Sequence, residues 1–152
     1  MPKIISYQKT SDAYATYDLH MPDVQDAEGE IYCTGLGTID GLTYVSVPPG
    51  VTLPEQLPQV AATLQTVTLT PELRAQLKAI SPHCALISAR MVQKIRARYS
   101  IDDEMFFARI GVGAAAGMYK PTPGELGEMQ TFGEFVEAVR QWGRAERAKL
   151  GL

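Results

Sequence analysis

Cysteine, histidine and tryptophan are scarce in this chain. Its 152 residues include two Cys, two His and one Trp. Two cysteines, Cys33 and Cys84, cannot form a disulfide framework in a chain of this size, and we expect two partly buried thiols. A zinc site that adds His20 and His83 is formally possible. The spacing argues against it, because His20 and Cys33 are thirteen residues apart and His83 and Cys84 are adjacent. We therefore predict no metal and no cofactor.

Long apolar runs are also lacking. No window approaches the roughly 20 apolar residues that a membrane-spanning helix needs, and the first twenty residues contain no apolar signal segment. The net charge of -3 is ordinary and argues against general binding to nucleic acid or to an acidic membrane surface. We expect synthesis in the cytoplasm and no membrane partner.

Sequence motifs of the common enzymes are absent too. There is no Gly-x-Ser-x-Gly, no His-Glu-x-x-His and no phosphate loop. The run Gly111 to Gly117 resembles a loosened dinucleotide fingerprint, but a helical segment precedes it where a strand is required. Small residues that let two helices approach closely explain the run better. The acids Asp102, Asp103 and Glu104 stand in the first turn of a predicted helix, where they complement its dipole. We predict no enzyme and no catalytic residue.

What the sequence does contain is a series of helix signals. Thr70 and Ser81 each precede a proline, and Ser100 precedes three acids within four residues, patterns typical of helix N-termini. Turns are expected at Ile80-Ser81 and Tyr99-Ser100. Apolar residues at helical intervals predict core-facing stripes. They are Cys84, Ile87, Met91, Val92, Ile95 and Tyr99; then Ile101, Met105, Phe106 and Ile110; and, on a last helix that reaches about Leu150, Phe132, Phe135, Val136, Val139 and Trp142.

The clearest β signal is a hairpin. Asp40-Gly41 is typical of a two-residue type I′ turn, here between residues 31–39 and 42–47. Such a turn fixes the register, with these predicted pairs: Ile39 with Leu42, Gly37 with Tyr44, Leu36 with Val45, and Thr34 with Val47. Gly35 and Gly37 weaken an isolated strand, so the hairpin needs a surface to lie on, either the helices or a second copy.

The expected fold is α+β, an N-terminal β-hairpin or small antiparallel meander followed by a C-terminal bundle of three to four helices. Residues 1–50 form the β-rich region, 51–69 a proline-containing connector and 70–152 the helical domain, together one compact unit. Within residues 1–30, short strands are possible at 3–7 and 14–19, and we expect an arm that orders only on a partner. Residues 60–69 are ambiguous between a helical turn and a strand.

A basic stripe lies on the second predicted helix. Arg90, Lys94 and Arg98 are four residues apart and share one helix face, as phosphate-contacting residues would. No aromatic residues interleave with them, acids follow, and cations near a helix C-terminus are favoured by the dipole in any case. A solvated or partner-facing surface is the better interpretation, and we expect no nucleic-acid partner.

Three stretches carry a family resemblance. The run from Ile95 to Glu104, followed by Val139 to Ala145, is similar to small phage and prophage proteins encoded beside tail-fibre genes. The segment Asp40 to Pro48 resembles part of the β-rich N-terminal region of those proteins. The resemblance implies a tail-associated component or a fibre assembly factor without known catalytic residues.

The functional hypothesis is a non-enzymatic protein that binds a tail or tail-fibre protein, in the host cytoplasm during assembly or in the virion, and self-associates into a homo-oligomer. The alternative is a small phage regulator or inhibitor that binds a host protein or nucleic acid through the basic stripe. The predicted partner-binding residues are Tyr32, Leu36, Tyr44, Val45, Arg90, Lys94, Arg98 and Trp142.

Overall fold

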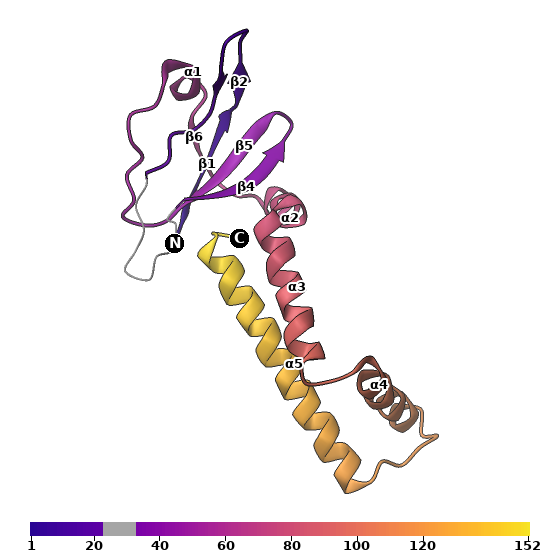
Figure 1. Ribbon diagram of the computed structural model, residues 1–152. Coiled ribbons are helices and arrows are strands. Elements are labelled where there is room, and N and C mark those ends of the chain that lie inside the picture. The colour runs from indigo at the N-terminus through magenta and orange to yellow at the C-terminus, as the bar shows by residue number, and fades with distance from the viewer. Residues whose placement is uncertain (23–32) are drawn as a thin grey trace. The chain divides into compact units, whose positions relative to one another are not determined.

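The computed structural model describes residues 1–22 and 33–152 (Figure 1). An antiparallel N-terminal sheet is followed by helices, which confirms the α+β class. The chain divides into two compact units, residues 1–86 with 146–152 and residues 87–145. This boundary differs from the expected one at residue 70, because the first long helix packs on the sheet. Each unit is described by itself below.

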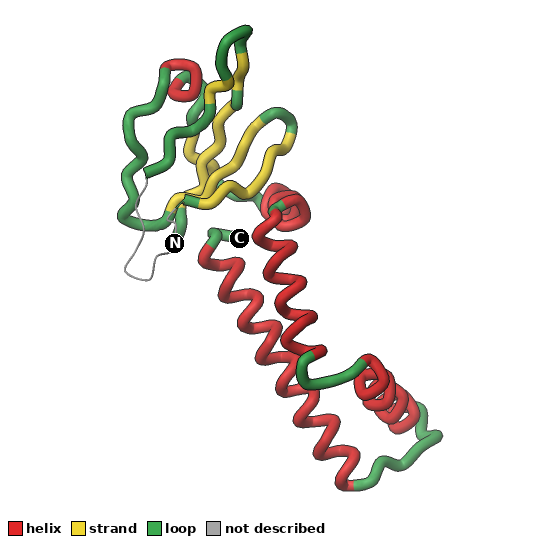
Figure 2. The backbone as a smooth tube through the Cα atoms, viewed as in Figure 1, coloured by secondary structure: helices red, strands yellow, loops and turns green. Residues whose placement is uncertain are grey.

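The first unit is built on a four-stranded sheet of order β4-β5-β1-β6 (Figure 2). Its central strand, β1 (Lys3–Gln8), pairs antiparallel with β5 (Leu42–Val47) and with β6 (Gln65–Val67). β4 (Thr34–Ile39) lies beyond β5. A separate pair joins β2 (Thr10–Ser11) to β3 (Thr16–Tyr17). The expectation of an N-terminal arm is wrong for β1, because four consecutive residues of this strand are buried.

The connector is more regular than expected. It contains the short helix α1 (Pro58–Ala61), which has proline at its first position, and then β6. Residues 60–69 therefore hold the end of a helix and a strand, and the strand is an edge of the sheet rather than a free linker.

The hairpin follows its predicted turn but only part of its predicted register. Asp40 and Gly41 both have positive φ, 50° and 79°, as a type I′ turn requires. The pairs Ile39 with Leu42 and Gly37 with Tyr44 are confirmed. The predicted partners of Leu36 and Thr34 are wrong, because a bulge shifts the register between Gly35 and Gly37, so that Gly35 pairs with Val45 and Thr34 with Ser46.

The bulge has a packing reason. In an unbroken register Leu36 would share a face with Val45. In the structure Leu36 instead joins the cluster of Tyr44 and Ile4, while Val45 lies in the cluster of Ile5. Gly37 allows this switch, because its φ of 137° is unfavourable for other residues, and Ile80 lies against the side where a Cβ would stand.

The sheet is covered on both faces. One cluster joins β1 and β5 to Leu19, Cys33 and Val60, with Val51, Leu53 and Leu64 packed against it. The other joins Ile4, Leu36 and Tyr44 to Leu77, Cys84 and Leu152. Helix α2 (Pro71–Ile80) and the C-terminal residues thus cover the second face. Arg74 ties them together, because its guanidinium donates to the carbonyl of Gly151 at 3.1 Å.

Three further helices follow, α3 (Pro82–Arg96), α4 (Ile101–Ala115) and α5 (Pro123–Lys149). The predicted turns at Ile80-Ser81 and Tyr99-Ser100 are confirmed. Thr70 caps α2 by accepting from the backbone N–H of Leu73. Ser100 and Asp103 form a capping box at the start of α4, where each side chain accepts from the backbone N–H of the other residue.

The predicted core stripes are confirmed on α5 and largely on α3. Val139 is buried, its neighbours on the stripe are half-buried, and on α3 only Val92 is wrong, since it is exposed. The α4 stripe is wrong in most members. Ile110 is buried, but the other three predicted core residues, Ile101, Met105 and Phe106, are exposed.

Gly37→Ala should destabilise the first unit by about 1–3 kcal/mol, because a Cβ there would lie 2.6 Å from Ile80 Cδ1 and the backbone would be strained. Gly35→Ala is the matched control on the same strand, since no atom lies within 4 Å of its added Cβ. Urea denaturation followed by circular dichroism measures both. Equal effects of the two substitutions would contradict the assigned bulge.

Tyr7 generates a pH prediction. Its hydroxyl donates to Asp18, which also pairs with Lys9 at 2.6 Å. Burial and then this hydrogen bond raise the pKa of Tyr7 to about 12, above the usual value of about 10. The pKa of Tyr7 is higher in the folded than in the unfolded state. The contribution of this shift to the free energy of unfolding is therefore complete below about pH 10 and is lost as the pH rises towards 12.

Tyr7→Phe should therefore flatten the fall in unfolding free energy over that alkaline interval. Urea unfolding at a series of pH values measures the slope, and Tyr14→Phe, which removes an exposed hydroxyl, is the control. A Tyr7→Phe profile parallel to that of the unsubstituted protein would refute the role given to this hydroxyl.

Candidate interaction surfaces

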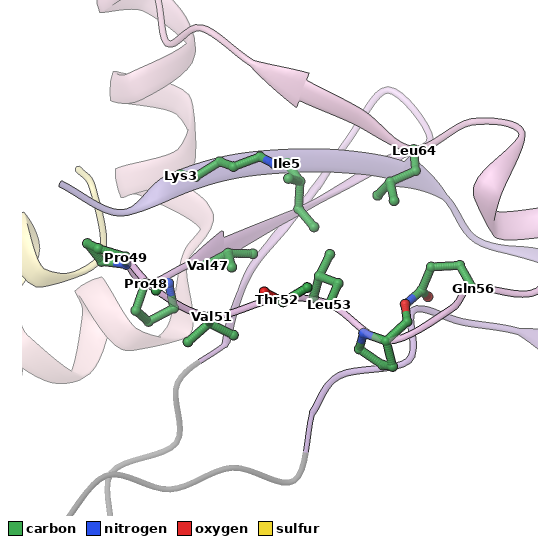
Figure 3. Close-up of a pocket in the computed structure, with 12 residues that line it drawn as sticks. Lys3, Ile5, Val47, Pro48, Pro49, Val51, Thr52, Leu53, Gln56 and Leu64 are labelled. Carbon is green, nitrogen blue, oxygen red and sulfur yellow. The ribbon is translucent and has the colours of Figure 1, made fainter.

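The first unit contains an open apolar groove between β1, β5 and residues 48–64 (Figure 3). Its volume is about 510 Å³. Val47, Val51 and Leu53 contribute apolar walls, and Lys3 is the only charged residue among the described residues of the lining. The lining residues are Lys3, Ile5, Val47, Pro48, Pro49, Gly50, Val51, Thr52, Leu53, Pro54, Gln56 and Leu64. Such a groove is suited to apolar side chains.

Hydrogen bonds hold one wall of this groove in place. Gln56 donates to the carbonyls of His20 and Pro54, at 2.9 and 2.7 Å, and its own carbonyl accepts from the backbone N–H of His20. Three prolines in the wall restrict its backbone further. The groove is therefore preformed, and its occupation requires little ordering of the wall.

The second unit is held together by aromatic side chains. Tyr99 follows α3 and meets Phe132 and Phe135 of α5, with ring centroids 5.0 and 5.7 Å apart. Phe107 of α4 stacks on Phe132 at 5.0 Å. One cluster thus joins α3, α4 and α5, and edge or offset contacts of this kind each contribute roughly 0.5–1.5 kcal/mol beyond burial.

Lys94 and Arg98 of the basic stripe pack against the same helix, α5. Lys94 Nζ lies 4.8 Å from the centroid of Trp142, and Arg98 Cζ lies 4.8 Å from that of Phe135 and 5.4 Å from that of Tyr99. These are cation–π distances. Sequence reasoning found no aromatic residues between the cations and missed this arrangement, because most of the rings come from a helix about forty residues further along the chain.

A second depression, of about 380 Å³, includes the acids Asp103 and Glu128 beside Arg98 and Tyr99. Asp103 accepts hydrogen bonds from the backbone N–H and the hydroxyl of Ser100, at 2.7 and 2.8 Å. These bonds lower the pKa of Asp103 below its usual value. The carboxylate is therefore kept ionised as a helix cap, which does not suit it to the role of a general acid.

The outward face of α4 carries several exposed apolar side chains. Ile101, Met105 and Val112 are 63%, 56% and 67% exposed, and Ala108 lies on the same side. The opposite side carries Ile110, which is buried. Ile101 and Met105 belong to the stripe that the sequence predicts to face the core, and that prediction is wrong for both because they are exposed.

The predicted partner-binding residues fall into three groups. Leu36, Tyr44 and Val45 lie in the cores of the first unit and present almost no side-chain surface to a partner. Arg90, Lys94, Arg98 and Trp142 belong to the second unit, with Lys94 and Arg98 over aromatic rings and Arg90 exposed. Tyr32 lies outside the described residues.

Both cysteines are buried and neither belongs to a disulfide bond, as expected, and burial raises the pKa of Cys33. Among residues 1–22 and 33–152, no group of three or more His, Cys, Asp or Glu side chains is placed to hold a metal ion. In the same part of the chain, none of the helices has the length and apolar character needed to cross a membrane.

Lys94→Gln should lower the free energy of unfolding by about 0.5–1 kcal/mol and change the fluorescence of Trp142, because it removes the cation above the ring. Trp142 is the only tryptophan, so its emission reports this contact directly. Arg90→Gln is the control on the same face of α3. Unchanged emission in Lys94→Gln would show that the ammonium group does not lie on the indole in solution.

Comparison with known proteins assigns no function to these surfaces. No protein-family model, no curated protein and no solved structure matches the chain.

Proposed function

We propose that this protein is a non-enzymatic, tail-associated structural or tail-fibre assembly protein of a phage, which acts by binding a tail or tail-fibre protein during assembly in the host cell. The observation that carries the proposal is the apolar, preformed groove of the first unit. A groove of this kind removes apolar side chains of a partner from water without reorganising its own walls.

The segment that resembles phage proteins contributes to this groove. Residues Asp40 to Pro48 form the hairpin turn and β5, and the last two of them, Val47 and Pro48, are part of the lining. Another resembling stretch, Ile95 to Glu104, contains the Ser100 capping box that begins α4. Both stretches therefore serve the architecture that supports binding surfaces, which agrees with a binding role.

The alternative, a regulator that binds a host protein or nucleic acid through Arg90, Lys94 and Arg98, has less support. Lys94 and Arg98 lie over aromatic rings, so their side chains already contribute to packing of the helical unit. Phosphate binding by the stripe would compete with those contacts.

The test is co-expression with the products of the genes on either side of this one, among which the proposal expects a tail or tail-fibre protein, followed by affinity purification. Thr52→Arg places a long, charged side chain at the groove from an exposed position outside the two cores. It should weaken the complex by roughly tenfold to a hundredfold, because a charge must be desolvated in an apolar site.

Thr68→Arg is the matched control, since Thr68 is also exposed but is not part of the lining. It should bind as the unsubstituted protein does. The proposal is wrong if no tail or tail-fibre protein is retained, or if both variants bind as tightly as the unsubstituted protein.

A further inference from the structure

Helix α4 is apolar on two opposite sides, and its own unit covers only one of them. Phe107 stacks on Phe132, and Ile110 is buried. Across the helix, Ile101, Met105, Ala108 and Val112 succeed one another at intervals of four, three and four residues. This spacing keeps them on one stripe and is that of the seam of a two-stranded coiled coil. The stripe is called the α4 seam below.

We propose that the α4 seam binds the α4 seam of a second copy of this chain, with the two helices antiparallel. A two-fold axis between residues 106 and 107 pairs Ile101 with Val112 of the second copy and Met105 with Ala108. Each layer then sets a larger side chain against a smaller one, and each pair occurs twice, as an isologous interface requires. This pairing is independent of the groove and of any tail protein.

Charge identifies a second copy as the occupant. Asp102 and Arg109 are seven residues apart, so they lie on the same flank of the seam. Within the described part of the chain, the side chain of neither residue has a hydrogen bond or an ion pair. Antiparallel pairing about the same axis brings Asp102 of one copy beside Arg109 of the other, twice. The surface is therefore complementary to itself in charge as well as in shape.

The parallel arrangement is less favourable. It would bring the two N-termini of α4 together, each with positive dipole and with the same cluster of three acids. In a parallel dimer Arg109 would face Glu104 of the second copy. Glu104 already forms an ion pair with Arg96 at 2.5 Å. The antiparallel arrangement keeps that pair intact and sets opposite helix dipoles side by side.

The first test is sedimentation of the full chain over micromolar to submillimolar concentrations. The protein should be in monomer–dimer equilibrium, and Val112→Glu should weaken dimerisation by roughly a hundredfold, because it places a charge in the seam. Val92→Glu is the matched control, an exposed valine of α3 outside the seam, 56% exposed. A protein that is monomeric at every concentration, or a dimer equally sensitive to both changes, overturns the proposal.

The second test reports orientation. Asp102→Arg and Arg109→Asp should each weaken dimerisation by about tenfold, because each sets like charges opposite one another. The double variant should restore dimerisation to within about threefold of the starting value, since the pair is re-formed with the signs exchanged. Thermal melts of the variants check that each remains folded.

Failure of the double variant to recover, with all variants folded, overturns the antiparallel pairing. In a parallel dimer the double variant would stay weak, because the carboxylate introduced by Arg109→Asp would face Glu104 of the second copy. Self-association is measured without any tail protein, so its failure leaves the proposed function standing, and the reverse also holds.

Discussion

The pairing of β1 between β5 and β6 is the constraint on which the first unit depends. A hairpin alone has one paired side and two bare faces, and it is marginal in water. β1 turns it into a sheet, and its consecutive buried residues require cover on both faces. Residues 51–64 supply one cover, while α2 and the C-terminal residues supply the other.

The groove is a consequence of the way in which residues 51–64 cover one face of the sheet. Helices pack densely on a sheet, but a proline-punctuated segment cannot form the ridges that would fill every gap. Val51 and Leu53 pack against the core, while Gly50, Thr52 and Pro54, between and beside them, line the groove. The same residues that close the core therefore leave an apolar depression beside it.

Local chemistry made part of this structure predictable. Asp40-Gly41 implies its turn, and Ser100 with Asp103 implies a helix start, because each feature is decided within a few residues. The bulge at Leu36 and the central position of β1 depend on partners distant in the chain, and no short pattern reports them. The contact of Lys94 with Trp142 is not predictable for the same reason, although both residues are among the predicted partner-binding residues.

The error on α4 has a different origin. Ile101 and Ile110 are nine residues apart, which places them about 180° apart around a helix with 3.6 residues per turn. No single stripe can contain both, so a helix that carries both must present apolar side chains in two opposite directions. The aromatic cluster decides which direction is inward, because Phe107 lies on the side of Ile110 and stacks on Phe132. The apolar pattern is thus the sum of two faces, and the outward face remains mostly exposed within its own unit. Its apolar residues become stabilising only when another surface removes them from water.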